Sequence, residues 1–110
     1  MTIVSVNKIT LTGCGPEEYE RWYREASAIM AAQPGHVSQR LWRSESRPDV
    51  YFAIAEWESA EHYRALMNVP EIVELFARLI TLPGPPPPSR PDKIAVEHHD
   101  AALVAARVPV

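Results

Sequence analysis

Alternation of apolar and polar side chains dominates the first part of the chain. Over residues 3–11, successive side chains change face with a period of two, and several of them are β-branched. This pattern is typical of a strand with one covered face. One face would carry Ile3, Ser5, Asn7, Ile9 and Leu11, and the other Val4, Val6, Lys8 and Thr10.

The spacing then changes to three and four residues, which predicts an amphipathic helix. Its apolar stripe consists of Tyr19, Trp22, Tyr23, Ala26, Ile29 and Met30. Pro16 suits the first helical position, because the N–H that proline lacks has no helical partner there in any case. Glu17 and Glu18 complement the positive end of the helix dipole. The pair Pro34-Gly35 predicts the end of the helix.

The rest of the chain predicts two strands, a broken helix and a last strand. Ser59 can accept a backbone N–H as a helix cap, and Pro70 interrupts that helix and can begin another. Proline cannot take part in a central strand, so the proline-rich stretch is expected to be an extended surface loop. In chain order the expected elements are strands at 36–44 and 50–57, helices at 59–68 and 70–80, the loop at 82–92 and a strand at 93–99.

This order is β-α-β-β-α-β, with the second helix in two pieces. The predicted fold class is therefore α+β, a ferredoxin-like split β-α-β-β-α-β arrangement with an antiparallel sheet. A chain of 110 residues is enough for one domain. We expect that domain to occupy residues 1–100, with residues 101–110 as a C-terminal tail.

Composition excludes several classes of protein. The net charge of −3 gives no electrostatic reason to expect nucleic-acid or membrane binding. No apolar run approaches the roughly 20 residues of a membrane span, and the N-terminus lacks the pattern of a signal peptide. Cys14 is the only cysteine, so no intrachain disulfide forms, which fits a reducing compartment. We expect a soluble cytoplasmic protein.

The strand at residues 50–57 suggests where a ligand binds. Tyr51, Ala53, Ala55 and Trp57 share one face of it. Two alanines between large aromatic side chains, with Ser5 on the first strand, leave room for a cavity. The alternative is that Trp22, Tyr23 and Phe76 fill this space as ordinary core.

Asn7 is a polar residue on an otherwise apolar strand face. An amide buried there without a partner costs about 1–3 kcal/mol, so it must bind either backbone at the sheet edge or a ligand. No His, Asp and Glu group has the spacing of metal ligands, so we expect no metal site. His98 and His99 are adjacent on a strand, point to opposite faces and cannot chelate one ion together.

Two strings of residues carry a family resemblance. The first runs from Pro34-Gly35 to Arg40-Leu41 and Arg43-Ser44, and the second is Ala55-Glu-Trp-Glu-Ser-Ala-Glu61. The chain resembles the antibiotic biosynthesis monooxygenase family, small ferredoxin-like proteins that often oxidise aromatic polyketides. This resemblance implies a homodimer, a dimeric α+β barrel, in which a second subunit covers the helix-free and rather apolar face of the sheet.

The resemblance also implies roles for particular residues. Asn7 and Trp57 match positions that face the substrate in the aromatic oxygenases of the family, and Tyr63 matches a phenol near the reacting carbonyl. Ala53 stands where those oxygenases usually carry a second asparagine, which is a departure from their pattern. The expected catalytic residues are thus Asn7, Trp57 and Tyr63, and the expected substrate-binding residues are Ser5, Trp22, Tyr23, Tyr51, Ala53, Ala55, Phe76 and Arg78.

The implied function is a monooxygenase that uses O₂ on a polycyclic phenol or anthrone-type compound and needs no cofactor. Exchangeable reduced flavin from a partner reductase is the alternative cofactor. Haem-degrading relatives of this fold use a histidine on the helix that corresponds to residues 71–82, which contain none here. Two other functions stay open: a polyketide cyclase or isomerase on the same scaffold, and a non-catalytic domain that binds a small ligand.

Overall fold

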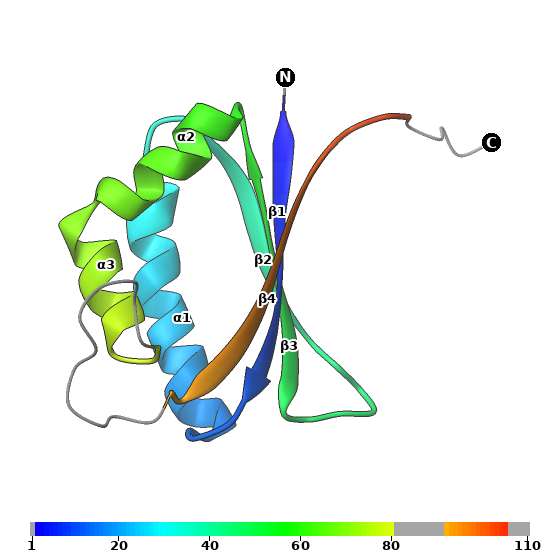
Figure 1. Cartoon of the computed structure of the whole chain (residues 1–110), viewed down its shortest axis with the longest axis vertical. Helices are drawn as coiled ribbons and strands as arrows, with labels where there is room; N and C mark the ends of the chain where they lie inside the picture. Colours follow the sequence, from blue (N-terminus) through cyan, green and yellow to red (C-terminus); the bar gives the residue numbers. More distant parts are fainter. Residues whose placement is uncertain (1, 81–91, 106–110) are drawn as a thin grey trace.

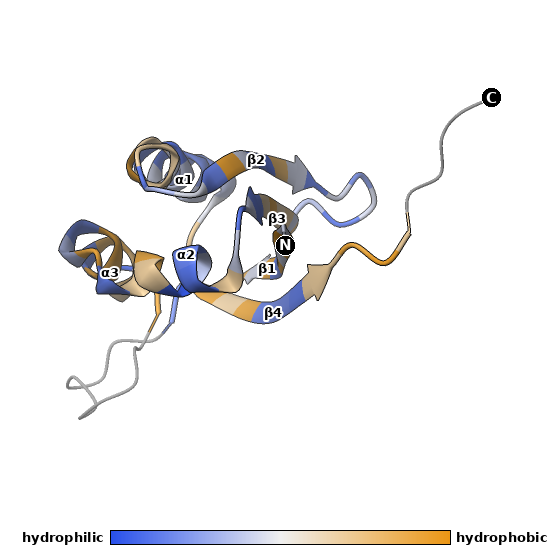
Figure 2. Ribbon diagram, turned by 90° about the horizontal axis from the view of Figure 1, so that it is seen from above, coloured by the Kyte–Doolittle hydropathy of each residue, from blue (hydrophilic) through white to orange (hydrophobic). Residues whose placement is uncertain are grey.

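The computed structural model of the chain describes residues 2–80 and 92–105, in which a four-stranded antiparallel sheet has order β2-β3-β1-β4. Helices cover one face of this sheet, and no helix of the described residues covers the other (Figures 1 and 2). This confirms the ferredoxin-like α+β class. The elements are β1 (Ile3–Leu11), α1 (Pro16–Ala31), β2 (His36–Arg43), β3 (Val50–Trp57), α2 (Ala60–Ala65), the 3₁₀ helix η1 (Leu66–Asn68), α3 (Pro70–Ala77) and β4 (Ile94–Ala102).

Strand β1 lies between β3 and β4, and its register decides which side chains become neighbours. Asn7 lies opposite Ala53 on β3 and opposite His98 on β4. Ser5 lies opposite Ala55 on β3. Residues that pair in this way share a face of the sheet, so the small and polar side chains gather beneath the helices.

The local signals at the helix ends act as expected. The Ser59 hydroxyl accepts a hydrogen bond from the His62 N–H at 3.2 Å, which caps α2. Pro16 and Pro70 stand at the first turns of α1 and α3. Gly35 has φ +80°, a left-handed conformation that reverses the chain between α1 and β2. Its carbonyl accepts the Glu58 N–H at 2.8 Å, which ties this turn to the segment before α2.

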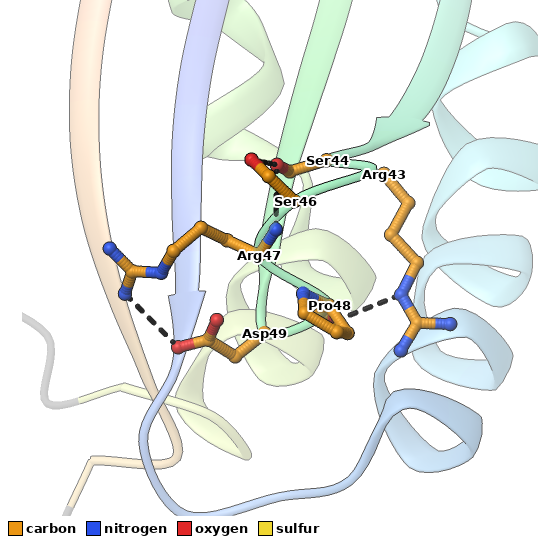
Figure 3. A network of polar contacts seen from close by, with 6 residues as sticks. All are labelled: Arg43, Ser44, Ser46, Arg47, Pro48 and Asp49. Atoms are coloured by element: carbon orange, nitrogen blue, oxygen red, sulfur yellow. Dashed lines mark hydrogen bonds and ion pairs between the residues drawn. The ribbon is translucent and has the colours of Figure 1, made fainter.

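The hairpin between β2 and β3 is closed by its own polar groups (Figure 3). Strand β2 ends at Arg43, one residue before the expected boundary, and the Ser44 N–H donates to the Val50 carbonyl at 2.9 Å across the hairpin. The Arg43 Nε donates to the carbonyl of Pro48 at 2.9 Å, and the Ser44 hydroxyl accepts the Arg47 N–H at 3.1 Å. These bonds satisfy backbone groups that the ladder leaves behind.

The last strand is longer than expected. It runs to Ala102 instead of His99, and Ala101 and Ala102, which are expected in the tail, pair with Val4 and Ile3. The reason is that β1 continues to offer ladder partners along its whole length, which the composition of residues 100–102 does not indicate. The proline-rich loop predicted at 82–92 lies, except for Asp92, outside the described residues.

Two groups of buried side chains hold the helices on the sheet. The larger consists of Ile9, Tyr19, Trp22, Ala26, Tyr51, Leu75, Leu79 and Ile94, and the smaller of Ala55, Trp57, Leu66 and Ile72. A buried aromatic side chain covers roughly 150–250 Å², which at about 25 cal/mol/Å² contributes about 4–6 kcal/mol relative to exposure. Among the described residues, no helix has the length and hydropathy to cross a membrane.

We expect Gly35→Ala to lower the free energy of unfolding by roughly 1–3 kcal/mol or more, because a non-glycine residue is strained at this φ. The added Cβ would also lie 2.2 Å from Cγ of His62. Gly15→Ala is the matched control, since nothing lies within 4 Å of its Cβ position, and it should change stability by no more than about 0.5 kcal/mol. Urea unfolding measures both. Equal effects in the two variants would contradict the left-handed turn.

Candidate active site

A cavity of about 80 Å³ lies between the helices and the covered face of the sheet. Its lining is largely apolar and aromatic, and the side chains of Ser5 and Asn7 reach it from β1. Eight of the residues that the sequence predicts for the site line this cavity: Ser5, Asn7, Trp22, Tyr23, Ala53, Ala55, Tyr63 and Phe76.

Both of the alternatives that the sequence left open are realised in part. The alanines of β3 leave space, but α1 and α3 fill some of it. The rings of Trp22 and Phe76 meet edge to face with centroids 5.2 Å apart, and Trp22 Nε1 donates to the Leu75 carbonyl at 2.7 Å. The cavity that remains is smaller than the roughly 150 Å³ that encloses one benzene molecule, and far below the 300–1,000 Å³ of typical ligand sites.

Two methionines that the sequence analysis did not assign to the site border this space. Met67 of η1 lines the cavity and is 46% exposed, and Met30 of α1 lines it as well. Methionine has an unbranched, adaptable side chain and can change rotamer at low cost. A ring-sized ligand can therefore enter only if side chains such as these move aside.

Among the described residues, the hydrogen-bond partner of the Asn7 side chain is a side chain of the neighbouring strand. His98 Nδ1 and Asn7 Oδ1 lie 2.5 Å apart, across the β1–β4 ladder. The Tyr63 ring stacks on the His98 ring, with centroids 5.5 Å apart and planes 8° apart. The cluster of Asn7, Tyr63 and His98 thus joins β1, α2 and β4 at the edge of the cavity.

His98 is the polar residue of this site that the sequence analysis did not assign to it. Residues 7 and 98 are far apart in the chain, and only the β1–β4 register brings them together. The prediction that His98 and His99 point to opposite faces is confirmed, because His99 instead pairs with Glu97 on the open face at 3.4 Å. Among the described residues there is no group of three side chains that could hold a metal ion.

Trp57 does not line the cavity. It is fully buried behind it, because it ends β3 at the point where the chain turns under α2 and η1. Its ring meets the rings of His36 and Tyr63 with centroids 5.2 and 6.1 Å away. Its Nε1 has no hydrogen-bond partner among the described residues, which costs about 1–3 kcal/mol. In this position Trp57 contacts Tyr63, which does line the cavity, from behind.

Tyr51 and Arg78 also lie away from the cavity. Tyr51 packs on Tyr19, with ring centroids 5.0 Å apart, and its hydroxyl donates to the Glu20 carboxylate at 2.5 Å. Arg78 is exposed on the solvent side of α3, where it forms ion pairs with Glu25 and Glu74, each at 3.6 Å. The face of β3 was predicted correctly for Tyr51, but α1 covers that end of the strand.

The phenols around the cavity are held in their neutral form. Burial raises the pKa of Tyr63, and the negative charge of Asp100 raises it further. Burial likewise raises the pKa of Tyr19 and Tyr23. Burial, followed by the hydrogen bond to Glu20, raises the pKa of Tyr51 to about 12. At neutral pH, Tyr63 is therefore a hydrogen-bond donor and not a phenolate base.

These features define a small ferredoxin-like domain with an aromatic cavity between sheet and helices. The sequence profile of the family described as antibiotic biosynthesis monooxygenase matches residues 2–78. The chain therefore belongs to the antibiotic biosynthesis monooxygenase family.

Particular relatives support this assignment. The chain is 32% identical over 68 residues to a deoxynogalonate monooxygenase of Streptomyces nogalater, covering 62% of this chain and 57% of that protein. It is 34% identical over 73 residues to a mycobilin-producing heme oxygenase of Mycobacterium tuberculosis, covering 66% of this chain and 69% of that protein. The crystal structure of a variant of SnoaB, a cofactor-independent oxygenase from Streptomyces nogalater, superposes with a TM-score of 0.78 at 25% identity, over 96% of this chain and 95% of SnoaB.

The pKa shifts predict how the stability depends on alkaline pH. All four tyrosines of the chain have a raised pKa in the folded protein. The unfolded chain ionises first, near the ordinary pKa of about 10. The contribution of these four phenols to stability should thus be fully present below about pH 10 and be lost as the pH rises through their folded pKa values. Titration of the phenolate absorbance in native and denatured protein measures this, and coincident curves would contradict it. Tyr51→Phe should remove one phenol that ionises at a higher pH in the folded protein than in the denatured protein.

Proposed function

We propose that this chain is a monooxygenase that oxidises a polycyclic phenol or anthrone-type aromatic compound with O₂, without a resident cofactor. The observation that carries the proposal is the single amide, Asn7, on the wall of an otherwise aromatic and apolar cavity. The named activities of two relatives, deoxynogalonate monooxygenase and the cofactor-independent oxygenase SnoaB, support the same reaction class.

The reaction requires few functional groups from the protein. An anthrone-type substrate loses a proton to give a delocalised enolate, which can transfer an electron to O₂ directly. Recombination gives a hydroperoxide, and loss of water leaves the new carbonyl, so that one CH₂ and O₂ become one C=O and H₂O. The site must hold the ring, exclude water and stabilise the enolate oxygen. Asn7 would donate to that oxygen, Tyr63 would pass a proton, and Trp57 would hold the Tyr63 ring in place.

A polycyclic substrate requires the cavity to open. The described cavity of about 80 Å³ does not hold one aromatic ring, so binding would displace Met67 and neighbouring side chains of η1. The binding energy of the remote rings would supply the cost of this movement. A monocyclic phenol, which offers less contact area, should be a poor substrate for the same reason.

One observation favours a second candidate. Ala53 lies directly opposite Asn7 in the β1–β3 register. The family resemblance implies a second asparagine at this position in the aromatic oxygenases. With a single amide donor, the site suits a cyclase or isomerase that moves protons without O₂. A conversion without change in mass and without oxygen uptake would select this candidate, and dependence on reduced flavin would select a flavin-assisted oxygenase.

Haem degradation is not proposed, although one relative carries that name. Helix α3 (Pro70–Ala77), on which haem-degrading proteins of this fold carry the iron ligand, contains no histidine. The donor set of this helix therefore does not fit a haem iron.

Asn7→Ala should lower kcat by ~10²–10³-fold, because it removes the donor to the developing oxyanion. Its unfolding free energy should change by only about 1 kcal/mol, since the residue borders a cavity. Oxygen uptake with an anthrone or hydroquinone substrate, beside thermal unfolding, measures both quantities. Tyr63→Phe keeps the ring and tests the proton transfer alone.

Trp57→Ala is the structural comparison and should cost about 3–5 kcal/mol of stability, because the side chain is fully buried. A large drop in the melting temperature of Asn7→Ala, with unchanged turnover per folded molecule, would remove Asn7 from the active site.

We also propose that the chain forms a homodimer across the open face of the sheet. Val4, Val6, Phe52 and Ile54 are only partly buried there, and Trp42 is 52% exposed. A contiguous apolar face of this kind on a small domain is typical of an interface.

Sedimentation at micromolar concentration should give twice the chain mass of 12.4 kDa. Ile54→Asp should shift the particle toward the monomer, because it places a charge in the apolar interface. Ala28→Asp on the exposed side of α1 is the control and should leave the mass unchanged. A stable monomer of the unmodified chain would contradict the dimer.

A further inference from the structure

We propose that His98 is a positioning residue, which fixes the Asn7 amide so that its NH₂ group faces the cavity. The effect of this orientation on activity rests on the proposed function. If the cavity binds a phenolate or enolate, the orientation of the Asn7 amide decides whether the anion meets a donor or an acceptor.

The polarity of the amide follows from its one strong contact. Asn7 has an oxygen that only accepts and a nitrogen that only donates. In the structure the oxygen lies 2.5 Å from His98 Nδ1, and in this orientation of the amide it is Nδ1 that carries the proton and donates. Nδ2 of Asn7 has no partner among the residues that the structure describes. Since Asn7 lines the cavity, its two N–H groups are the ones left for a ligand oxygen.

Tyr63 contacts the His98 ring but does not determine which of its nitrogens carries the proton. The Tyr63 hydroxyl lies 3.3 Å from Nε2 and 3.5 Å from Nδ1 of His98, nearly the same distance from both. A hydrogen bond along one lone pair would bring the hydroxyl close to one nitrogen only, so it lies over the face of the ring, in keeping with the stacked geometry. The contact with Asn7 is therefore what places the proton on Nδ1.

The charged and titratable groups around His98 do not oppose this arrangement. Asp100 follows two residues later on the same face of β4, and the Tyr63 phenol lies above the ring. Nδ1 carries a proton in the charged imidazolium as well as in the Nδ1–H neutral form. The amide of Asn7 thus keeps the same direction in both protonation states of His98.

A matched pair of substitutions separates polarity from shape. In His98→Asn the new amide can donate to Asn7 Oδ1, whereas in His98→Asp a carboxylate of the same size can only accept, which turns the Asn7 amide around. We expect kcat/KM to be nearly retained in His98→Asn and to fall in His98→Asp toward the ~10²–10³-fold loss of a missing oxyanion donor. Ala28→Asp adds a negative charge on the exposed side of α1, away from both the cavity and the open face of the sheet, and should leave activity unchanged.

Two further measurements decide the role. In an Asn7→Ala background, His98→Asp should cause no additional loss, because a positioning residue acts only through the group it positions. An equal loss in both backgrounds, or equal activity of His98→Asn and His98→Asp, would overturn the inference.

Nitrogen-15 NMR of histidine-labelled protein tests the same point without any turnover. His98 should show a protonated Nδ1 at neutral pH that reverts to the common Nε2–H form in Asn7→Ala. An Nε2–H ring that Asn7→Ala does not alter would refute the proposal. A protonated Nδ1 in a protein that consumes no O₂ with any aromatic substrate would instead count against the proposed function alone.

Discussion

The pairing of β1 with both β3 and β4 is the constraint on which the rest of this structure depends. Strand β1 pairs with β3 from the middle of the chain and with β4 from near its end, and its register places Asn7 between Ala53 and His98. A shift of one residue would move every side chain of β1 to the opposite face. The candidate site is thus a consequence of register, and no single loop builds it.

The cavity exists because small side chains occupy core positions in one part of the sheet. Ser5, Ala53 and Ala55 leave space where larger side chains would have packed, and Trp22 and Phe76 restore part of the packing from the helices. A protein interior tolerates few voids, so such a space is destabilising unless a ligand or neighbouring side chains occupy it. The small cavity and its two methionines are consistent with a site that stays nearly closed until a ligand opens it.

Aromatic rings connect this cavity to the core. Trp57 is fully buried and contacts Tyr63, which in turn stacks on His98 at the edge of the sheet. Through these contacts, the stability of the core determines the position of the polar groups at the cavity. Substitutions of Trp57 would therefore change both stability and the site, whereas substitutions of Asn7 affect one side chain at its border.

The order of the elements, their approximate ends and about half of the cavity lining could be predicted from the sequence. Proline and glycine at positions 16, 35 and 70, the cap at Ser59 and the period of two in β1 act locally, and local signals survive without knowledge of the partner. The site could be predicted as far as it depends on which residues share one strand face, as for Asn7, Ala53 and Ala55.

Tertiary structure alone decided the rest. Whether Tyr51 and Trp57 face the cavity depends on where α1, α2 and η1 cover β3. Whether Arg78 reaches the cavity depends on which side of α3 faces solvent. The length of β4 and the partnership of Asn7 with His98 depend on a pairing between the two ends of the chain. The hydrogen-bonded register between distant strands cannot be read from the local pattern of either strand. The alternation of apolar and polar residues in each strand is compatible with several partners and registers.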